Sequence, residues 1–184
     1  MTNRIKTVQN PKLILVACKN SERISGIISD ILNFCHYNTC VDSFSENTDF
    51  IIANYSEKFT IPKDIIADTV IFDGSSDLND EIITKFRNRA TSYEYCLKKY
   101  GEDVRNILTY SSENYDADVT YRNKGISPDG AAVFDVIGTG ILSRVRLENS
   151  VFSIDEVLVC TAVLIATGIP IASILGYFNS YDDK

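Results

Sequence analysis

No stretch of the sequence approaches the about 18 consecutive apolar residues that a membrane-spanning helix needs. The first residues lack the apolar core of a signal peptide, so we expect a cytoplasmic protein that does not contact a membrane. The five cysteines form no C-x-x-C pair, and their odd number argues against a complete disulfide framework. His36 is the only histidine and follows a predicted helix, where capping is a more ordinary role than a place in a Ser-His-Asp triad.

Positive charge is scarce. The chain has 18 Lys and Arg against 25 Asp and Glu, which gives a net charge of −7. This balance excludes a global attraction to nucleic acid or to an anionic membrane. The local basic groups, Lys85, Arg87 and Arg89 followed by Lys98 and Lys99, are predicted to be the solvated face of a helix, with a basic patch as the alternative.

The junction between the first predicted strand and the first predicted helix contains no glycine. Residues 12–17 form an apolar run that is typical of a buried parallel strand, and residues 21–35 carry isoleucines at helical spacing. Nucleotide-binding α/β folds place their phosphate loop at such a junction, where glycines let the backbone wrap the phosphates and a lysine reaches them. This junction instead carries Glu22. We therefore predict no ATP cleavage and no cofactor at this loop.

Strands and helices alternate through the first two thirds of the chain. Strands are predicted at 12–17, 39–41, 50–53 and 69–72, and helices at 21–35 and from a cap at Asp77 or Asn79 to Gly101. This order predicts an α/β fold with a mainly parallel, doubly wound sheet and helices on both faces.

The pattern changes after residue 104. Short strands are predicted at 106–110, 118–122, 132–137 and 142–147, of which two or three form an antiparallel meander. Ser153 and Glu156 form a capping-box pattern at the start of a helix that Gly168 ends, and Pro170 begins a shorter helix. We expect one domain over residues 1–184, with an α/β part at 1–104, the meander at 105–150 and a C-terminal helix pair at 151–184.

The second half of the sequence resembles the end of the Mur ligase central domain. The segments I-L-T-Y-S-S-E-N-Y-D-A-D-V, G-A-A-V-F-D-V and V-L-V-C-T-A-V-L-I-A-T-G-I-P follow one another over residues 106–178. The family has a similar order: a strand ending in T-Y-G, an A-D-V strand, a G-x-x-F-x-V hairpin and an alanine-rich helix ending in L-G-I-P. Members use ATP to join amino acids to peptidoglycan precursors, so the resemblance implies a link to that metabolism.

The first half departs from that family where the family binds ATP and metal. The loop G-T-N-G-K-T-T of the family falls on residues 18–24, where Asn20 alone is retained and Glu22 replaces the phosphate-binding lysine. The magnesium-binding glutamate of the family falls on Asn54, whose amide offers a neutral oxygen. The sequence also contains no counterpart of the domains that hold the nucleotide-linked substrate and the amino acid. We therefore predict a degenerate, non-catalytic domain that acts by binding, as a partner or regulatory subunit.

Polar residues at the start of the first helix leave a weaker binding function open. Lys19, Asn20, Ser21, Arg23 and Ser25 cluster at a helix N-terminus, where the dipole and unpaired N–H groups attract anions. This cluster predicts a vestigial anion site for a weakly bound phosphate or acidic group. A plain helix cap by Asn20 or Ser21 is the alternative.

Two further functional classes also remain open. One is an ATP-dependent amide-bond ligase that another chain completes or that binds nucleotide through a rearranged loop. The other is a self-associating structural protein. The expected partner is accordingly a protein or a second copy of the chain. Three side-chain clusters have a functional and a structural interpretation: a reactive thiol at Cys18, a zinc set of Cys35, His36 and Cys40, and a docking face of Tyr93, Leu97 and Tyr100.

Overall fold

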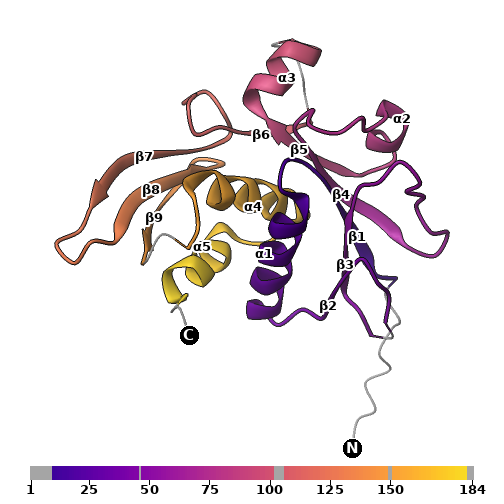
Figure 1. The fold of residues 1–184 in the computed structure, drawn as a ribbon, viewed down its shortest axis with the longest axis horizontal. Helices are drawn as coiled ribbons and strands as arrows, with labels where there is room; N and C mark the ends of the chain where they lie inside the picture. Colours follow the sequence, from indigo (N-terminus) through magenta and orange to yellow (C-terminus); the bar gives the residue numbers. More distant parts are fainter. Residues whose placement is uncertain (1–9, 46, 102–105, 149–150, 182–184) are drawn as a thin grey trace, which may run out of the picture.

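The computed structural model describes residues 10–45, 47–101, 106–148 and 151–181, which form one nine-stranded sheet with helices on both faces (Figure 1). The strand order is β2-β3-β1-β4-β5-β6-β7-β8-β9. Neighbours from β2 to β7 pair in parallel, and β7, β8 and β9 pair antiparallel. The strands are β1 (Lys12–Ala17), β2 (Thr39–Val41), β3 (Phe50–Asn54), β4 (Ile66–Phe72), β5 (Asn88–Ser92), β6 (Leu108–Tyr110), β7 (Val119–Ile126), β8 (Ala132–Gly138) and β9 (Ile141–Leu147). The predicted parallel sheet and meander are thus confirmed.

The helices divide the core into two layers. The larger layer lies between the sheet and α1 (Ser21–Phe34), α4 (Ile154–Thr167) and α5 (Ile171–Ser180). Helix α4 lies at its centre and contacts α1, α5 and the strands from β4 to β8 (Figure 1). The smaller layer, on the opposite face, packs β1, β3 and β4 against α2 (Asp80–Ile83) and side chains of α3 (Tyr93–Tyr100). No helix in the described part of the chain has the length and apolarity to cross a membrane.

The single long helix predicted from Asn79 to Gly101 is wrong. Asn79 does cap a helix, because its Oδ1 accepts the backbone N–H of Glu81 at 2.7 Å, but that helix ends at Ile83. The chain then enters β5, which lies between β4 and β6 and buries Ala90. Pairing on both sides satisfies the backbone of this short strand and outweighs its weak local preference for extended structure. Arg89 therefore lies in a strand and Arg87 in the bend before it, and neither is on a helix face.

The boundaries of the C-terminal helix pair follow local signals. The Ser153 hydroxyl accepts the Glu156 N–H at 3.1 Å and the Glu156 carboxylate accepts the Ser153 N–H at 2.8 Å, which completes the predicted capping box. Gly168, at φ 97°, ends α4 in a left-handed conformation that glycine adopts without strain. Pro170 stands at the N-cap of α5.

Candidate functional site

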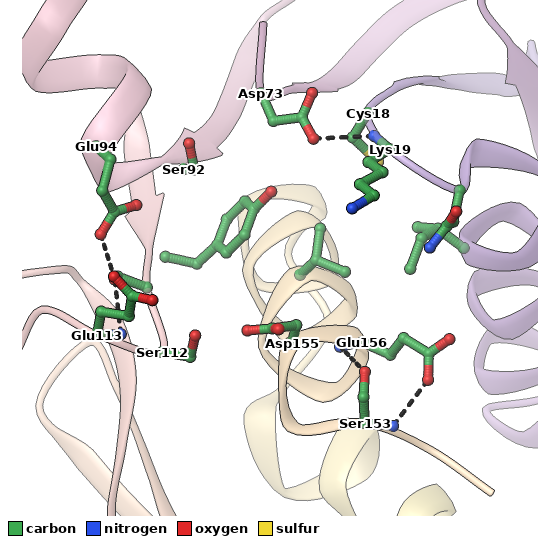
Figure 2. A pocket seen from close by; sticks show the side chains of 15 residues that line it. Cys18, Lys19, Asp73, Ser92, Glu94, Ser112, Glu113, Ser153, Asp155 and Glu156 are labelled. Carbon is green, nitrogen blue, oxygen red and sulfur yellow. Dashed lines mark hydrogen bonds between the residues drawn. The ribbon is translucent and has the colours of Figure 1, made fainter. Parts of the chain in front are cut away.

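A pocket of about 640 Å³ lies at the carboxyl ends of β1, β4, β5 and β6, where open α/β sheets place their ligands. The first turns of α3 and α4 and the loop before α1 complete its wall (Figure 2). We call it the β-end pocket. Its lining residues are Cys18, Lys19, Asn20, Ile24, Asp73, Ser92, Glu94, Tyr110, Ser111, Ser112, Glu113, Ser153, Asp155, Glu156 and Val159.

The turn from β1 to α1 is built without glycine. Asn20 adopts the left-handed conformation at φ 58° that asparagine tolerates better than most side chains, and its C=O accepts the first helical bond from Ile24 at 3.0 Å. Asn20 is the N-cap, but its side chain makes no capping hydrogen bond. The Lys19 backbone N–H donates to the Asp73 carboxylate at 2.9 Å (Figure 2). A backbone donor that a phosphate loop would offer to its ligand is therefore occupied by a side chain of the protein.

Arg23 is held by the N-terminus of α4. Its guanidinium forms an ion pair with Glu156 and donates to the C=O of Val151 at 2.6 Å. Burial alone would raise the pKa of Glu156, but the hydrogen bonds from Arg23 and from the Ser153 N–H outweigh it and lower that pKa. The contact joins two elements 133 residues apart in sequence. Arg23 therefore serves a tertiary contact and does not line the β-end pocket.

Ser25 and Asn54 are hydrogen-bonded to each other and do not line the pocket. Ser25 is completely buried and donates to Asn54 Oδ1 at 2.9 Å. The Asn54 amide nitrogen and backbone N–H donate to the two oxygens of Asp42 at 2.6 and 2.8 Å. Both ends of the amide are thus engaged within the protein. Asn54 thus joins α1 to the loop after β2.

The five residues of the predicted anion site are not brought together in one cavity. Lys19 and Asn20 line the β-end pocket, and the Lys19 side chain extends toward its middle (Figure 2). Ser21, Arg23 and Ser25 are not among its lining residues. An anion that enters the pocket would meet one ammonium group and an amide.

Carboxylates dominate the β-end pocket. They come from separate elements: Asp73 after β4, Glu94 in α3, Glu113 after β6, and Asp155 and Glu156 in α4 (Figure 2). Lys19 is the only basic residue among those that line the pocket. Sequence reasoning missed this acidic lining because the five residues span positions 73 to 156. The available signal was their shared position, just after a strand or in the first turn of a helix.

A hydrogen-bonded turn shapes the wall opposite α4. The Ser111 hydroxyl donates to the Glu94 carboxylate at 2.5 Å and accepts the backbone N–H groups of Glu113 and Asn114 at 3.0 and 2.9 Å. Burial, followed by the nearby acidic groups, raises the pKa of the neighbouring Tyr110 hydroxyl. These contacts fix the residues after β6 and leave Tyr110 a neutral phenol.

The reactive-thiol interpretation of Cys18 is wrong. Burial, and secondarily the charge of Asp73, raises the pKa of Cys18 to about 12. At neutral pH the side chain is a buried, protonated thiol, which is a poor nucleophile.

Residues of the other two sequence clusters make contacts within the protein. Cys40 Sγ lies within 3.2 Å of the hydroxyls of Ser45 and Thr48, and no three His, Cys, Asp or Glu side chains of the described residues form a metal-binding group. On α3, Leu97 is 42% exposed, whereas the Tyr100 hydroxyl bonds to Asp80 at 3.3 Å. The predicted aromatic docking face is thus partly used within the protein.

Comparison with solved structures identifies the fold. A UDP-N-acetylmuramoyl-L-alanyl-D-glutamate–2,6-diaminopimelate ligase matches 97% of this chain with a TM-score of 0.65 and 13% identity. MurF ligase from Thermotoga maritima, solved in complex with ADP, matches 95% with a TM-score of 0.59 and 13% identity. A pseudomurein peptide ligase type C from Methanothermus fervidus matches 95% with a TM-score of 0.60 and 10% identity.

The chain spans about half the length of these ligases, with 48%, 52% and 50% of them covered, respectively. No protein-family profile and no curated protein sequence matches it. Identities of 10–13% establish a common architecture and leave the chemistry to be argued from the site. The chain therefore has a Mur ligase-like fold.

Proposed function

We propose that this chain is a non-catalytic Mur ligase-like domain that acts by binding, as a partner or regulatory subunit. The observation that carries the proposal is the charge of the β-end pocket, where Glu156 is paired with Arg23 and the other four carboxylates are accompanied by one lysine. A site for a nucleoside triphosphate needs the opposite balance, because phosphoryl transfer depends on positioning and on stabilising negative charge.

The magnitude of the repulsion supports this proposal. At about 4 Å and an effective dielectric constant of about 20, one unit-charge pair interacts by about 4 kcal/mol. The electrostatic repulsion between a triphosphate and two of these carboxylates would exceed its attraction to one lysine. A divalent cation could reverse the balance, but the amide at Asn54 is already bonded to Ser25 and Asp42.

The fold supports a link to peptidoglycan precursors, since the similar structures include ligases that are named for muramoyl substrates. In this proposal the domain keeps the scaffold of a ligase and contacts a protein partner of that metabolism. Catalysis is left to other chains.

Isothermal titration with ATP and magnesium tests the proposal directly. We expect no saturable heat for the unaltered chain or for Lys19→Ala. Lys124→Ala, an exposed lysine on β7 outside the pocket, is the matched charge control. Micromolar affinity that Lys19→Ala abolishes, and that Lys124→Ala retains, would instead establish the ligase alternative.

A further inference from the structure

A second cavity lies beside the amino ends of β5 and β6, whereas the β-end pocket lies at the carboxyl ends of the strands. Strands β5 and β6 are neighbours in the sheet (Figure 1). Its volume is about 510 Å³. Its lining residues, which define what we call the arginine pocket, are Arg87, Asn88, Arg89, Asn106, Ile107, Leu108 and Ala166. Two guanidinium groups and two amides thus share a cavity that is lined by no carboxylate of the described residues.

The two arginines differ from the other arginines of the described chain. Neither Arg87 nor Arg89 forms an ion pair with a described residue. The others have partners: Arg23 with Glu156, Arg144 with Asp135, Arg146 with Asp129 and Glu148, and Arg122 with the ring of Tyr115.

Arg89 also carries a buried donor that nothing in the described structure satisfies. Its Nε atom is removed from solvent and has no hydrogen-bond partner. Most buried polar groups in folded proteins are paired, and a charged donor left unpaired carries a desolvation penalty. Arg89 as a whole is only partly buried, so a small shift of its side chain would bring Nε to an acceptor in the cavity and remove that penalty.

The sheet fixes the backbone of both arginines. Arg89 pairs with Val70 in the β4–β5 register, and the backbone N–H of Arg87 donates to the C=O of Ala67 at 3.2 Å. The apolar part of the wall comes from Ile107 and Leu108 at the start of β6 and from Ala166 of α4. A guanidinium on a fixed backbone is suited to bidentate recognition of a planar or tetrahedral oxyanion.

We infer that the arginine pocket binds an oxyanion, a phosphate or carboxylate group of a small ligand, through the guanidinium groups of Arg87 and Arg89. Asn88 and Asn106 provide neutral donors around the same cavity. This site is separate from the β-end pocket and does not depend on the function proposed for it.

Nuclear magnetic resonance of the arginine Nε–Hε groups tests the inference with the full chain. Inorganic phosphate is the probe, added against sodium chloride of equal ionic strength. We expect the Arg89 resonance, assigned by its absence in Arg89→Lys, to shift and saturate, because Nε gains an acceptor. A shift that grows linearly without saturation would overturn the inference.

Variants show whether both arginines hold the anion. Arg87 is exposed, so Arg87→Ala is expected to leave the fold intact while weakening phosphate binding by about tenfold. Arg122→Ala, which removes an exposed arginine on β7, is the matched control and keeps the affinity. Equal affinity in Arg87→Ala and the unaltered chain would contradict a site built on both guanidinium groups.

A parallel titration with acetate separates the two ligand chemistries. Saturation by phosphate alone assigns a phosphoryl ligand, and saturation by both assigns a general oxyanion site. Saturation by acetate alone assigns a carboxylate. Saturation by neither excludes the site.

Discussion

The surroundings of each thiol set its reactivity. Hydrogen bonds from Ser45 and Thr48 lower the pKa of Cys40, whereas burial raises the pKa of Cys18 to about 12. Burial also raises the pKa of Cys160, in the middle of α4. Because the thiolate is the nucleophile, these shifts order the cysteines by reactivity.

We predict that iodoacetamide alkylates Cys40 first in the native protein at about pH 8. Peptide mapping by mass spectrometry over time measures the order. Cys40→Ser should remove the fast phase, and Cys18→Ser should leave it unchanged. Labelling of Cys18 as fast as Cys40 would show that the β1–α1 loop opens readily.

The pair of Arg23 and Glu156 contributes stability that depends on pH. The native pKa of Glu156 lies below the ordinary value of 4.5, so the unfolded chain binds a proton more readily. Its stabilisation is therefore present above about pH 4.5 and is lost as pH falls through the lower native value. Arg23 is half exposed, so solvent screening limits the effect.

We predict that Glu156→Gln lowers the free energy of unfolding by about 0.5–1 kcal/mol at neutral pH, because glutamine keeps the capping box and loses only the charge. The difference should vanish in acid. Ser153→Ala should lose about 1 kcal/mol at both pH values. Urea unfolding measured at the two pH values separates the roles, and a loss for Glu156→Gln that persists in acid would contradict an ionic origin.

Strand β9 forms one edge of the sheet, and α5 covers part of that edge. The Asn179 side chain accepts the backbone N–H of Arg146 at 2.8 Å and donates to the C=O of Arg144 at 3.1 Å. These two bonds occupy backbone groups that another strand could otherwise pair with. Ile141 and Leu142, at the start of β9, remain exposed.

We predict that Asn179→Ala makes the protein self-associate through β9 as its concentration rises. Light scattering over a dilution series measures the change in mass. Ser180→Ala, at the neighbouring position of α5, removes a helix-end hydrogen bond only and should leave the mass unchanged. A constant mass for Asn179→Ala would show that the freed edge does not pair.

The elements also show which local signals suffice for prediction. The apolar run of β1 and the capping box of α4 act within a few residues, and both predictions are confirmed. Strand β5 was missed because its residues, Asn88–Ser92, include charged and small polar side chains that do not favour a strand. Its pairing with β4 and β6 creates a structure that the segment would not form alone.

Helix α4 joins the parallel part of the sheet to the meander. It contacts strands from β4 to β8 as well as α1 and α5, and Leu158 in it is completely buried. A helix shared in this way couples the unfolding of both parts.

We predict that Leu158→Ala lowers the free energy of unfolding by about 2–5 kcal/mol and preserves a single transition. Circular dichroism and tyrosine fluorescence in urea should give the same midpoint. Leu142→Ala, at a leucine that is 59% exposed, should change stability by less than about 0.5 kcal/mol. Two separate midpoints would show that the meander unfolds independently.

The amino-acid sequence was sufficient for features that neighbouring residues decide: the loop without glycine after β1, the caps of α4, and the turn-separated strands of the meander. The resemblance to Mur ligases, carried by the order of such features, is matched by the fold. Only the tertiary structure revealed the acidic lining of the β-end pocket and the shared cavity of Arg87 and Arg89. Both depend on strand order and on contacts between distant residues, for which a linear sequence carries no local signal.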